Sequence, residues 1–151
     1  MTDHRTVFNH VGICVGDRTR SRRFYKELLG FKFWWELDPP EEPTAKLLQL
    51  DQPVGLHATY LVRDGLVLEL LDYSGRQPRR GAERVMDQLG LTHISLSVSD
   101  LATILRKVAE FGGSVVEETV AAGSAMIRDP DGQLLELVAD GWLAALPPRP
   151  E

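Results

Sequence analysis

The sequence lacks several features that would place it in common protein classes. Its 151 residues contain one cysteine, Cys14, so no disulfide can form within the chain. No apolar run approaches the roughly 20 residues that a transmembrane helix needs. The first residues, MTDHRT, form no apolar signal core. These absences predict a cytoplasmic protein that contacts no membrane.

The chain also has no surplus of positive charge. It carries 17 Lys and Arg against 22 Asp and Glu, a net charge of -5. Proteins that bind nucleic acid use excess Lys and Arg to neutralise phosphates, so no nucleic-acid partner is expected. The charged fraction of 26% and the hydrophobic fraction of 43% are close to globular averages, which argues against a disordered or fibrous chain.

What the sequence does contain is an internal repeat. The segments FNHVGICVGD (8–17) and LTHISLSVSD (91–100) alternate polar and apolar residues as half-buried strands do. A shift of 83 residues superposes His10 on His93. A second echo, DGLVLELLD against DGQLLELVA, matches Glu69 with Glu136 at a shift 16 residues shorter. The first half therefore carries a longer middle, LDPPEEPTAKLLQLDQPVGLHAT, whose prolines predict a loop.

Two copies of strand, helix and three strands predict an α+β domain with two small antiparallel sheets. Each helix is expected to begin near an Asp, to cover an outer sheet face and to end at a glycine, Gly30 or Gly113. The predicted helices span 19–29 and 101–111. The predicted strands span 8–15, 31–37, 46–50, 56–62, 66–72, 91–98, 114–120, 123–128 and 133–139. The domain is expected over 7–140, with module one at 7–73, a linker at 74–90, module two at 91–140, and tails at 1–6 and 141–151.

The two glutamates interrupt apolar rows on their strands. Glu69 shares a strand face with Val67 and Leu71. A buried carboxylate without a partner is costly, and a cation is a common remedy. A single His or Glu near a strand end is more often a surface or hydrogen-bonded residue, but here the same pair occurs in both halves. Two imidazoles and two carboxylates suit a divalent ion with positions left open for water or substrate. The expected ligands are His10, Glu69, His93 and Glu136.

Four segments, NHVGICV, SRRFYKELLGF, LTHISLSVSDL and IRDPDGQLLELV, resemble the vicinal oxygen chelate superfamily over residues 7–140. This superfamily includes glyoxalase I, methylmalonyl-CoA epimerase, extradiol dioxygenases, fosfomycin-resistance enzymes and bleomycin-binding proteins. The resemblance implies two tandem βαβββ modules that form an open, cup-shaped mixed sheet around a divalent metal ion. It places His10, Glu69, His93 and Glu136 at the four ligand positions, and it implies a homodimer.

The resemblance favours a lyase or isomerase that acts on a metal-chelating small molecule through a metal-stabilised enolate. Glu136 resembles the glyoxalase base, and Glu69 could act on the opposite face of the substrate. Ni, Co, Zn, Mn and Fe all suit the donor set. Cys14 and Tyr73 stand where glutathione-using glyoxalases have Arg and Asn, which argues against glutathione. A metal-dependent dioxygenase is an alternative, although Met126 stands where ring-cleaving enzymes have a Tyr. A metal-free drug-binding resistance protein is the other alternative.

Three further predictions concern side chains near this site. Trp34 and Trp35 occupy successive strand positions, so one should face inward and the other outward. His57 is expected at the surface rather than inside the cup. The arginines near the first helix, Arg18, Arg20, Arg22 and Arg23, are expected in solvent, with the alternative that they hold a carboxylate or phosphate of the substrate.

Overall fold

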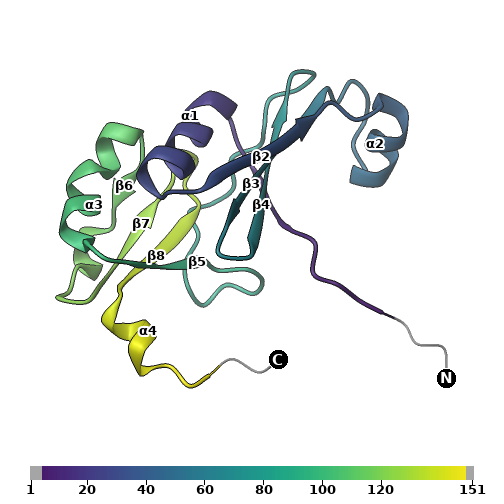
Figure 1. The fold of residues 1–151 in the computed structure, drawn as a ribbon. Coiled ribbons are helices and arrows are strands. Elements are labelled where there is room, and N and C mark those ends of the chain that lie inside the picture. Colours follow the sequence, from purple (N-terminus) through teal and green to yellow (C-terminus); the bar gives the residue numbers. More distant parts are fainter. Residues whose placement is uncertain (1–4, 149–151) are drawn as a thin grey trace. The chain divides into compact units, whose positions relative to one another are not determined.

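The computed structural model describes residues 5–148, which fall into two compact units that divide between Arg79 and Arg80 (Figure 1). The expected loose tail LPPRPE lies partly outside the described residues. Over residues 5–148, no helix is long and apolar enough to cross a bilayer. Each unit has its own sheet and its own buried apolar side chains.

The first unit is built around a four-stranded mixed sheet with strand order β1-β4-β3-β2. β1 pairs with β4 in parallel, and the other pairs are antiparallel. The antiparallel sheets expected from the strand pattern are thus mixed, as the family resemblance implied, because two helices and two further strands separate β1 from β4 and no hairpin turn sets their relative direction. The elements are β1 (Val11–Cys14), α1 (Arg18–Arg23), a π-helical turn (Phe24–Leu28), β2 (Lys32–Leu37), α2 (Glu41–Leu48), β3 (Leu56–Arg63) and β4 (Leu66–Tyr73).

The second unit repeats this topology with strand order β5-β8-β7-β6, again with the first strand parallel to the last. Two βαβββ modules with mixed sheets confirm the predicted α+β class. The strand expected at 114–120 is shorter than predicted and gives way to a 3-10 turn. The elements are β5 (Ile94–Val98), α3 (Leu101–Lys107), 3-10 turns (Val108–Phe111 and Glu117–Thr119), β6 (Ser114–Val115), β7 (Ser124–Arg128), β8 (Leu134–Ala139) and α4 (Gly141–Ala145).

Local sequence signals explain the repeated helix starts. The Asp17 carboxylate caps α1 by accepting the backbone N–H of Arg20 at 2.9 Å. The Asp100 carboxylate caps α3 in the same way through Thr103, also at 2.9 Å. Such caps satisfy N–H groups that have no partner within the helix. In the second unit, the 3-10 turn that follows α3 ends at Gly112, whose φ is 83°, rather than at the predicted Gly113.

The two faces of the first sheet differ in what covers them. Helix α1 packs on β4, and Arg22 of α1 pairs with Glu36 of β2 at 2.9 Å. In the strand register Glu36 lies opposite Thr59, and Thr59 lies opposite Leu70, which is fully buried. These residues share the α1 side of the sheet. Glu69 precedes Leu70 on β4, so its side chain lies on the other face.

That other face is partly covered by α2, where the sequence predicted a loop and a strand at 46–50. Both predictions are wrong for this segment. Pro40 is the N-cap of α2 and Pro43 lies in its first turn, where a missing N–H costs nothing. Ala45 packs with Val54 and Leu56, and these three contact Leu48, Leu50, Leu71 and Tyr73. The longer middle of the first half is therefore a helix that covers one end of the Glu69 face.

Candidate functional site

The first pair of predicted ligands meets on the Glu69 face of the first sheet. His10 lies just before β1, and its Nε2 is 3.0 Å from Oε2 of Glu69 on β4. The Glu69 side chain is 11% exposed and the His10 side chain 32%. Nδ1 of His10 lies 2.7 Å from the side-chain carbonyl oxygen of Asn9. That oxygen can only accept, so Nδ1 carries the proton, and in the neutral ring Nε2 keeps its lone pair for a ligand.

Tyr60 holds the second oxygen of Glu69. It lies directly opposite Glu69 in the β3–β4 register, and its hydroxyl donates a 2.6 Å hydrogen bond to Oε1 of Glu69. Burial, together with this hydrogen bond and the negative charge of Glu69, raises the pKa of Tyr60 to about 12. Tyr60 therefore remains a proton donor at neutral pH and fixes the orientation of the carboxylate.

The second pair lies in the second unit. Nε2 of His93 is 3.6 Å from Oε2 of Glu136 on β8. Nδ1 of His93 lies 2.8 Å from the Thr92 hydroxyl, and the Ser95 hydroxyl donates a 2.6 Å hydrogen bond to Glu136. The Glu136 side chain is 37% exposed, far more than that of Glu69. The second carboxylate is thus the more accessible of the two.

The donor set of each pair fits a cation. In the first pair, Nε2 of His10 and a carboxylate oxygen of Glu69 lie 3.0 Å apart, and both atoms can present a lone pair to a cation held between them. Within either unit, the described residues contain no group of three or more His, Cys, Asp and Glu side chains that could hold an ion. The structure brings His10 to Glu69 and His93 to Glu136, and the four-ligand site predicted from the sequence stays a proposal.

Four functional neighbours were missed from the sequence: Asn9, Tyr60, Thr92 and Ser95. Asn9 and Thr92 each directly precede a predicted ligand, so a repeated polar residue before His was an available signal. Tyr60 and Ser95 reach their carboxylates across strand pairs, and no sequence signal gives that register without the structure.

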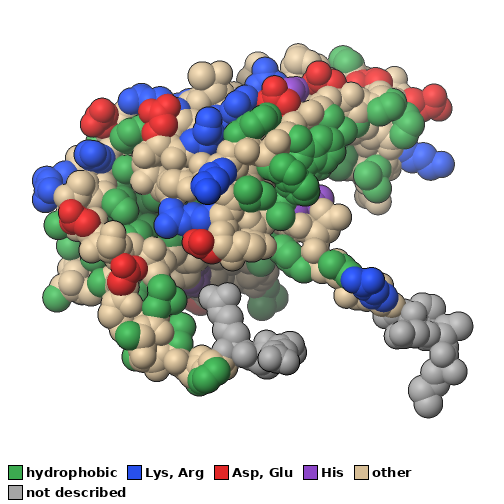
Figure 2. All heavy atoms as spheres, viewed as in Figure 1, with side chains coloured by type: hydrophobic (Ala, Val, Ile, Leu, Met, Phe, Trp, Pro, Cys, Tyr) green, Lys and Arg blue, Asp and Glu red, His purple; other side chains and the backbone are tan. Residues whose placement is uncertain are grey.

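Both tryptophans expected on opposite sides of the sheet contact Tyr60. The strand register shifts between Phe33 and Trp35, so the simple alternation of β2 is broken there. The Trp35 ring stacks on the Tyr60 ring at 4.7 Å, and Trp34 meets the same ring edge-on at 6.4 Å. The prediction of one inward and one outward tryptophan is therefore wrong. Figure 2 shows hydrophobic side chains gathered over β2.

His57 is half-buried rather than at the surface, because it lies on the α1 side of the sheet. Its Nδ1 is 2.7 Å from Asp38, and its Nε2 is 3.5 Å from Glu36. It faces Asp72 across the strand pair, and burial raises the pKa of Asp72 despite the opposing charges of Arg18 and His57. This polar cluster is separated from the His10–Glu69 pair by the sheet itself.

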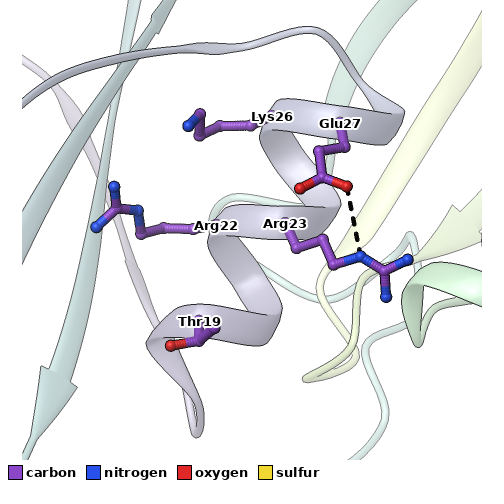
Figure 3. Close-up of a pocket in the computed structure, with 5 residues that line it drawn as sticks. All are labelled: Thr19, Arg22, Arg23, Lys26 and Glu27. Carbon is purple, nitrogen blue, oxygen red and sulfur yellow. Dashed lines mark ion pairs between the residues drawn. The ribbon is translucent and has the colours of Figure 1, made fainter.

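A shallow pocket of about 250 Å³ lies along α1 and the π-helical turn that follows it, and neither His10 nor Glu69 lines it. Figure 3 shows its lining side chains, Thr19, Arg22, Arg23, Lys26 and Glu27; Arg22 and Lys26 point to the left of the helix and Arg23 to the right. Arg22 pairs with Glu36 at 2.9 Å, and Arg23 pairs with Glu27 at 3.4 Å. Two of its three cations are thus already neutralised, so the pocket offers little for an anionic substrate.

Comparison with known proteins identifies the family of this chain. Residues 7–137 match the Glyoxalase/Bleomycin resistance protein/Dioxygenase superfamily, and the chain belongs to that superfamily. A probable chloroplastic lactoylglutathione lyase of Arabidopsis thaliana is 32% identical over 138 residues, which make up 87% of this chain and 35% of the relative. The chain thus spans about a third of that relative. The lactoylglutathione lyase of Escherichia coli O157:H7 is 30% identical over 136 residues, 87% of this chain and 90% of the relative.

Solved structures show the same fold. A glyoxalase family protein from Bacillus cereus has a TM-score of 0.77 at 17% identity, covering 92% of this chain and 97% of its own. Leishmania major glyoxalase I has a TM-score of 0.65 at 24% identity, covering 89% and 87%. The fosfomycin resistance protein FosX of Listeria monocytogenes, solved with Mn(II) and sulfate, has a TM-score of 0.60 at 15% identity, covering 89% and 93%. The resemblance and the glyoxalase-like fold expected from the sequence are both confirmed.

Proposed function

We propose that this chain is a divalent-metal-dependent lyase or isomerase of the glyoxalase type, acting on a small substrate with two adjacent oxygens. The observation that carries the proposal is the repeated pairing of an imidazole Nε2 with a glutamate oxygen, at 3.0 Å in one unit and 3.6 Å in the other. The lactoylglutathione lyase relatives and the manganese-containing FosX structure support metal use.

In this proposal one ion is held by four ligands, His10, Glu69, His93 and Glu136. The four ligands come from one chain or from two copies of it. A divalent cation there would stabilise the negative charge that develops on a substrate oxygen when the neighbouring carbon loses its proton. The imidazoles act as neutral ligands. Asn9 fixes the ring of His10 through Nδ1, and Thr92 contacts the corresponding atom of His93.

The two glutamates have different roles in the proposal. Glu69 is held at both oxygens, by the Tyr60 hydroxyl and by His10, and is nearly buried. Glu136 is more exposed, and its contacts with Ser95 and His93 are both made by Oε2. A general base must lie within hydrogen-bond reach of the proton it removes, so it needs access to the substrate. Glu136 therefore takes the proton from carbon and returns it, while Glu69 acts on the opposite face of the substrate or serves as a fixed ligand.

We do not propose glutathione, which appears in the names of the relatives, as part of the substrate of this chain. Cys14 and Tyr73 stand where the family resemblance implies Arg and Asn for binding glutathione. Both lie on the Glu69 face of the sheet, since Cys14 pairs with Leu71 and Tyr73 follows two residues later on the same strand. We therefore propose a substrate conjugate without the charged groups of glutathione.

Metal analysis tests this function directly. Untagged protein should contain one divalent ion per four-ligand site, and one of Ni, Co, Zn, Mn or Fe should raise the melting temperature of metal-stripped protein. A chain with both His10→Ala and His93→Ala should lose both effects, whereas His57→Ala should keep them. A metal-free protein that no ion stabilises would instead favour a drug-binding resistance protein, and metal-dependent oxygen consumption would favour a dioxygenase. Light scattering tests the expected homodimer.

A further inference from the structure

The first unit carries an aromatic cluster, Trp34, Trp35 and Tyr60, whose two tryptophans have no part in the proposed chemistry. The Trp35 and Tyr60 rings are stacked with centroids 4.7 Å apart and an interplanar angle of 6°. Trp34 meets Trp35 edge-on at 6.2 Å and Tyr60 edge-on at 6.4 Å. Trp34 is 58% exposed and Trp35 is 42% exposed, so the cluster presents a large apolar surface to its surroundings.

This cluster is continuous with the candidate metal ligands. Trp35 lies opposite Tyr60 in the β2–β3 register, and Tyr60 lies opposite Glu69 in the β3–β4 register. The three side chains therefore form one row across the same sheet face. The Tyr60 hydroxyl is bonded to Glu69, and the His10 ring meets the Tyr60 ring edge-on at 5.6 Å. The aromatic cluster therefore directly adjoins the His10–Glu69 pair.

Over its described residues, 80–148, the second unit has no counterpart of this row. Met126 occupies the position opposite Glu136 that Tyr60 occupies opposite Glu69. β6, the strand equivalent to β2, contains only Ser114 and Val115. The aromatic surface is thus a property of the Glu69 half alone, and the repeated scaffold does not require it.

We propose that the substrate carries a planar apolar group beside its two adjacent oxygens, and that this group lies against Trp34 and Trp35. The inference rests on the proposed function, since the oxygens must be held at the ligand pairs. Small-molecule sites combine a mostly apolar wall with a few convergent polar groups, as this row does. Aromatic rings stack or meet edge-on with a planar ligand and gain more than simple burial gives.

Two 2-hydroxy acids that differ only in this group serve as probes: mandelate, with a phenyl ring, and lactate, with a methyl group. Binding is measured by calorimetry on the full chain loaded with Mn(II). We expect mandelate to bind at least about tenfold more tightly than lactate. Trp35→Leu should reduce this ratio to about two or less. Trp142→Leu is the matched control, because Trp142 is also 58% exposed but lies in the second unit on α4, and the ratio should not change.

The outcomes separate the two proposals. If Mn(II) binds but both acids bind equally, the proposed contact with Trp34 and Trp35 is wrong and the proposed metal site stands. If none of Ni, Co, Zn, Mn and Fe binds, the proposed function fails, and the proposed aromatic contact fails with it. An unchanged ratio of the two affinities in Trp35→Leu also overturns the proposed contact. If light scattering shows that this variant has lost a dimer, the cluster instead forms a contact between two copies of the chain. Melting temperatures of the metal-free variants establish that each is folded.

Discussion

The hydroxyl of Ser95 donates a 2.6 Å hydrogen bond to Oε2 of Glu136 from the neighbouring parallel strand. In the first unit the equivalent position, opposite Glu69, is Gly12. A Cβ atom at Gly12 would lie 3.4 Å from Oε2 of Glu69 and 3.3 Å from Leu71. The first unit has no room for a serine there without displacement, and Tyr60 supplies the hydroxyl from the opposite side. The two repeats therefore orient equivalent carboxylates by different neighbours.

Removing the Ser95 hydroxyl should weaken the second half of the site. Ser95→Ala leaves Oε2 of Glu136 without its serine donor, and groups that orient metal ligands typically contribute about tenfold or more to metal affinity or activity. We expect about a tenfold rise in the Kd for Mn(II), measured by titration. Ser97→Ala is the control, since Ser97 lies two residues further along the same strand face. Equal affinities for Mn(II) in the two variants would show that Ser95 does not position Glu136.

Tyr60→Phe tests the corresponding contact in the first half. The substitution keeps the ring that stacks on Trp35 and removes only the hydroxyl that donates to Glu69. We expect the Kd for Mn(II) to rise about tenfold, while the preference for mandelate over lactate is retained. Tyr73→Phe is the control, because Tyr73 lies on the same face of β4 but packs against the α2 cluster. A change in the mandelate preference without a change in metal affinity would contradict the assigned role of Tyr60.

The sequence predicted both His–Glu pairs because each pair could be compared with its repeat in the other half. His10 and Glu69 alone are unremarkable, but strict alternation fixed their strand face, and His93 with Glu136 repeated it. Strand alternation is local and readable from sequence. Which residues lie opposite Glu69 and Glu136 depends on pairing between strands, so Tyr60 and Ser95 became visible only in the structure.

The α2 segment was misread for a related reason. It falls in the longer middle of the first half, so the second half offered no copy to compare. Its prolines suggested a loop, yet Pro40 and Pro43 occupy the start of a helix, where proline is tolerated. What stabilises the helix is tertiary contact, the packing of Ala45 on Val54 and Leu56. Propensity within the segment does not contain that information.

Glu41 should make stability depend on pH. Its carboxylate accepts hydrogen bonds from the backbone N–H groups of Val54 and Gly55, and these bonds lower the pKa of Glu41 from its usual 4.5. A carboxyl with a lowered pKa in the folded state adds stability that is complete above its unfolded pKa and is lost as pH falls through the folded pKa. Glu41→Gln should therefore lower the urea midpoint at neutral pH, and the difference from the unmodified chain should shrink below pH 4.5.

The neighbouring Glu42 provides the control for this effect. It is exposed on the same helix, so Glu42→Gln removes the same charge without removing those backbone contacts. We expect its urea midpoint to match that of the unmodified chain at both pH values. A Glu41→Gln chain that unfolds at an equally reduced midpoint in neutral and acidic buffer would show that packing, rather than the ionised carboxylate, accounts for the loss.

Replacing each glutamate separately tests which one moves the proton. Glu136→Gln removes the proposed base, and general-base catalysis typically contributes 10²- to 10⁴-fold, so we expect kcat to fall by about that factor. Glu69→Gln keeps a side chain of the same shape beside Tyr60 and should lower metal affinity more than kcat at saturating metal.

The measurement is turnover of 2-oxoaldehydes mixed with small uncharged thiols, together with exchange of the substrate C–H proton with D₂O. Glu118→Gln, on an exposed turn of the second unit, is the control for lost charge. If Glu136→Gln kept full exchange while Glu69→Gln abolished it at equal metal occupancy, the assignment would be reversed, and the more buried carboxylate would be the base.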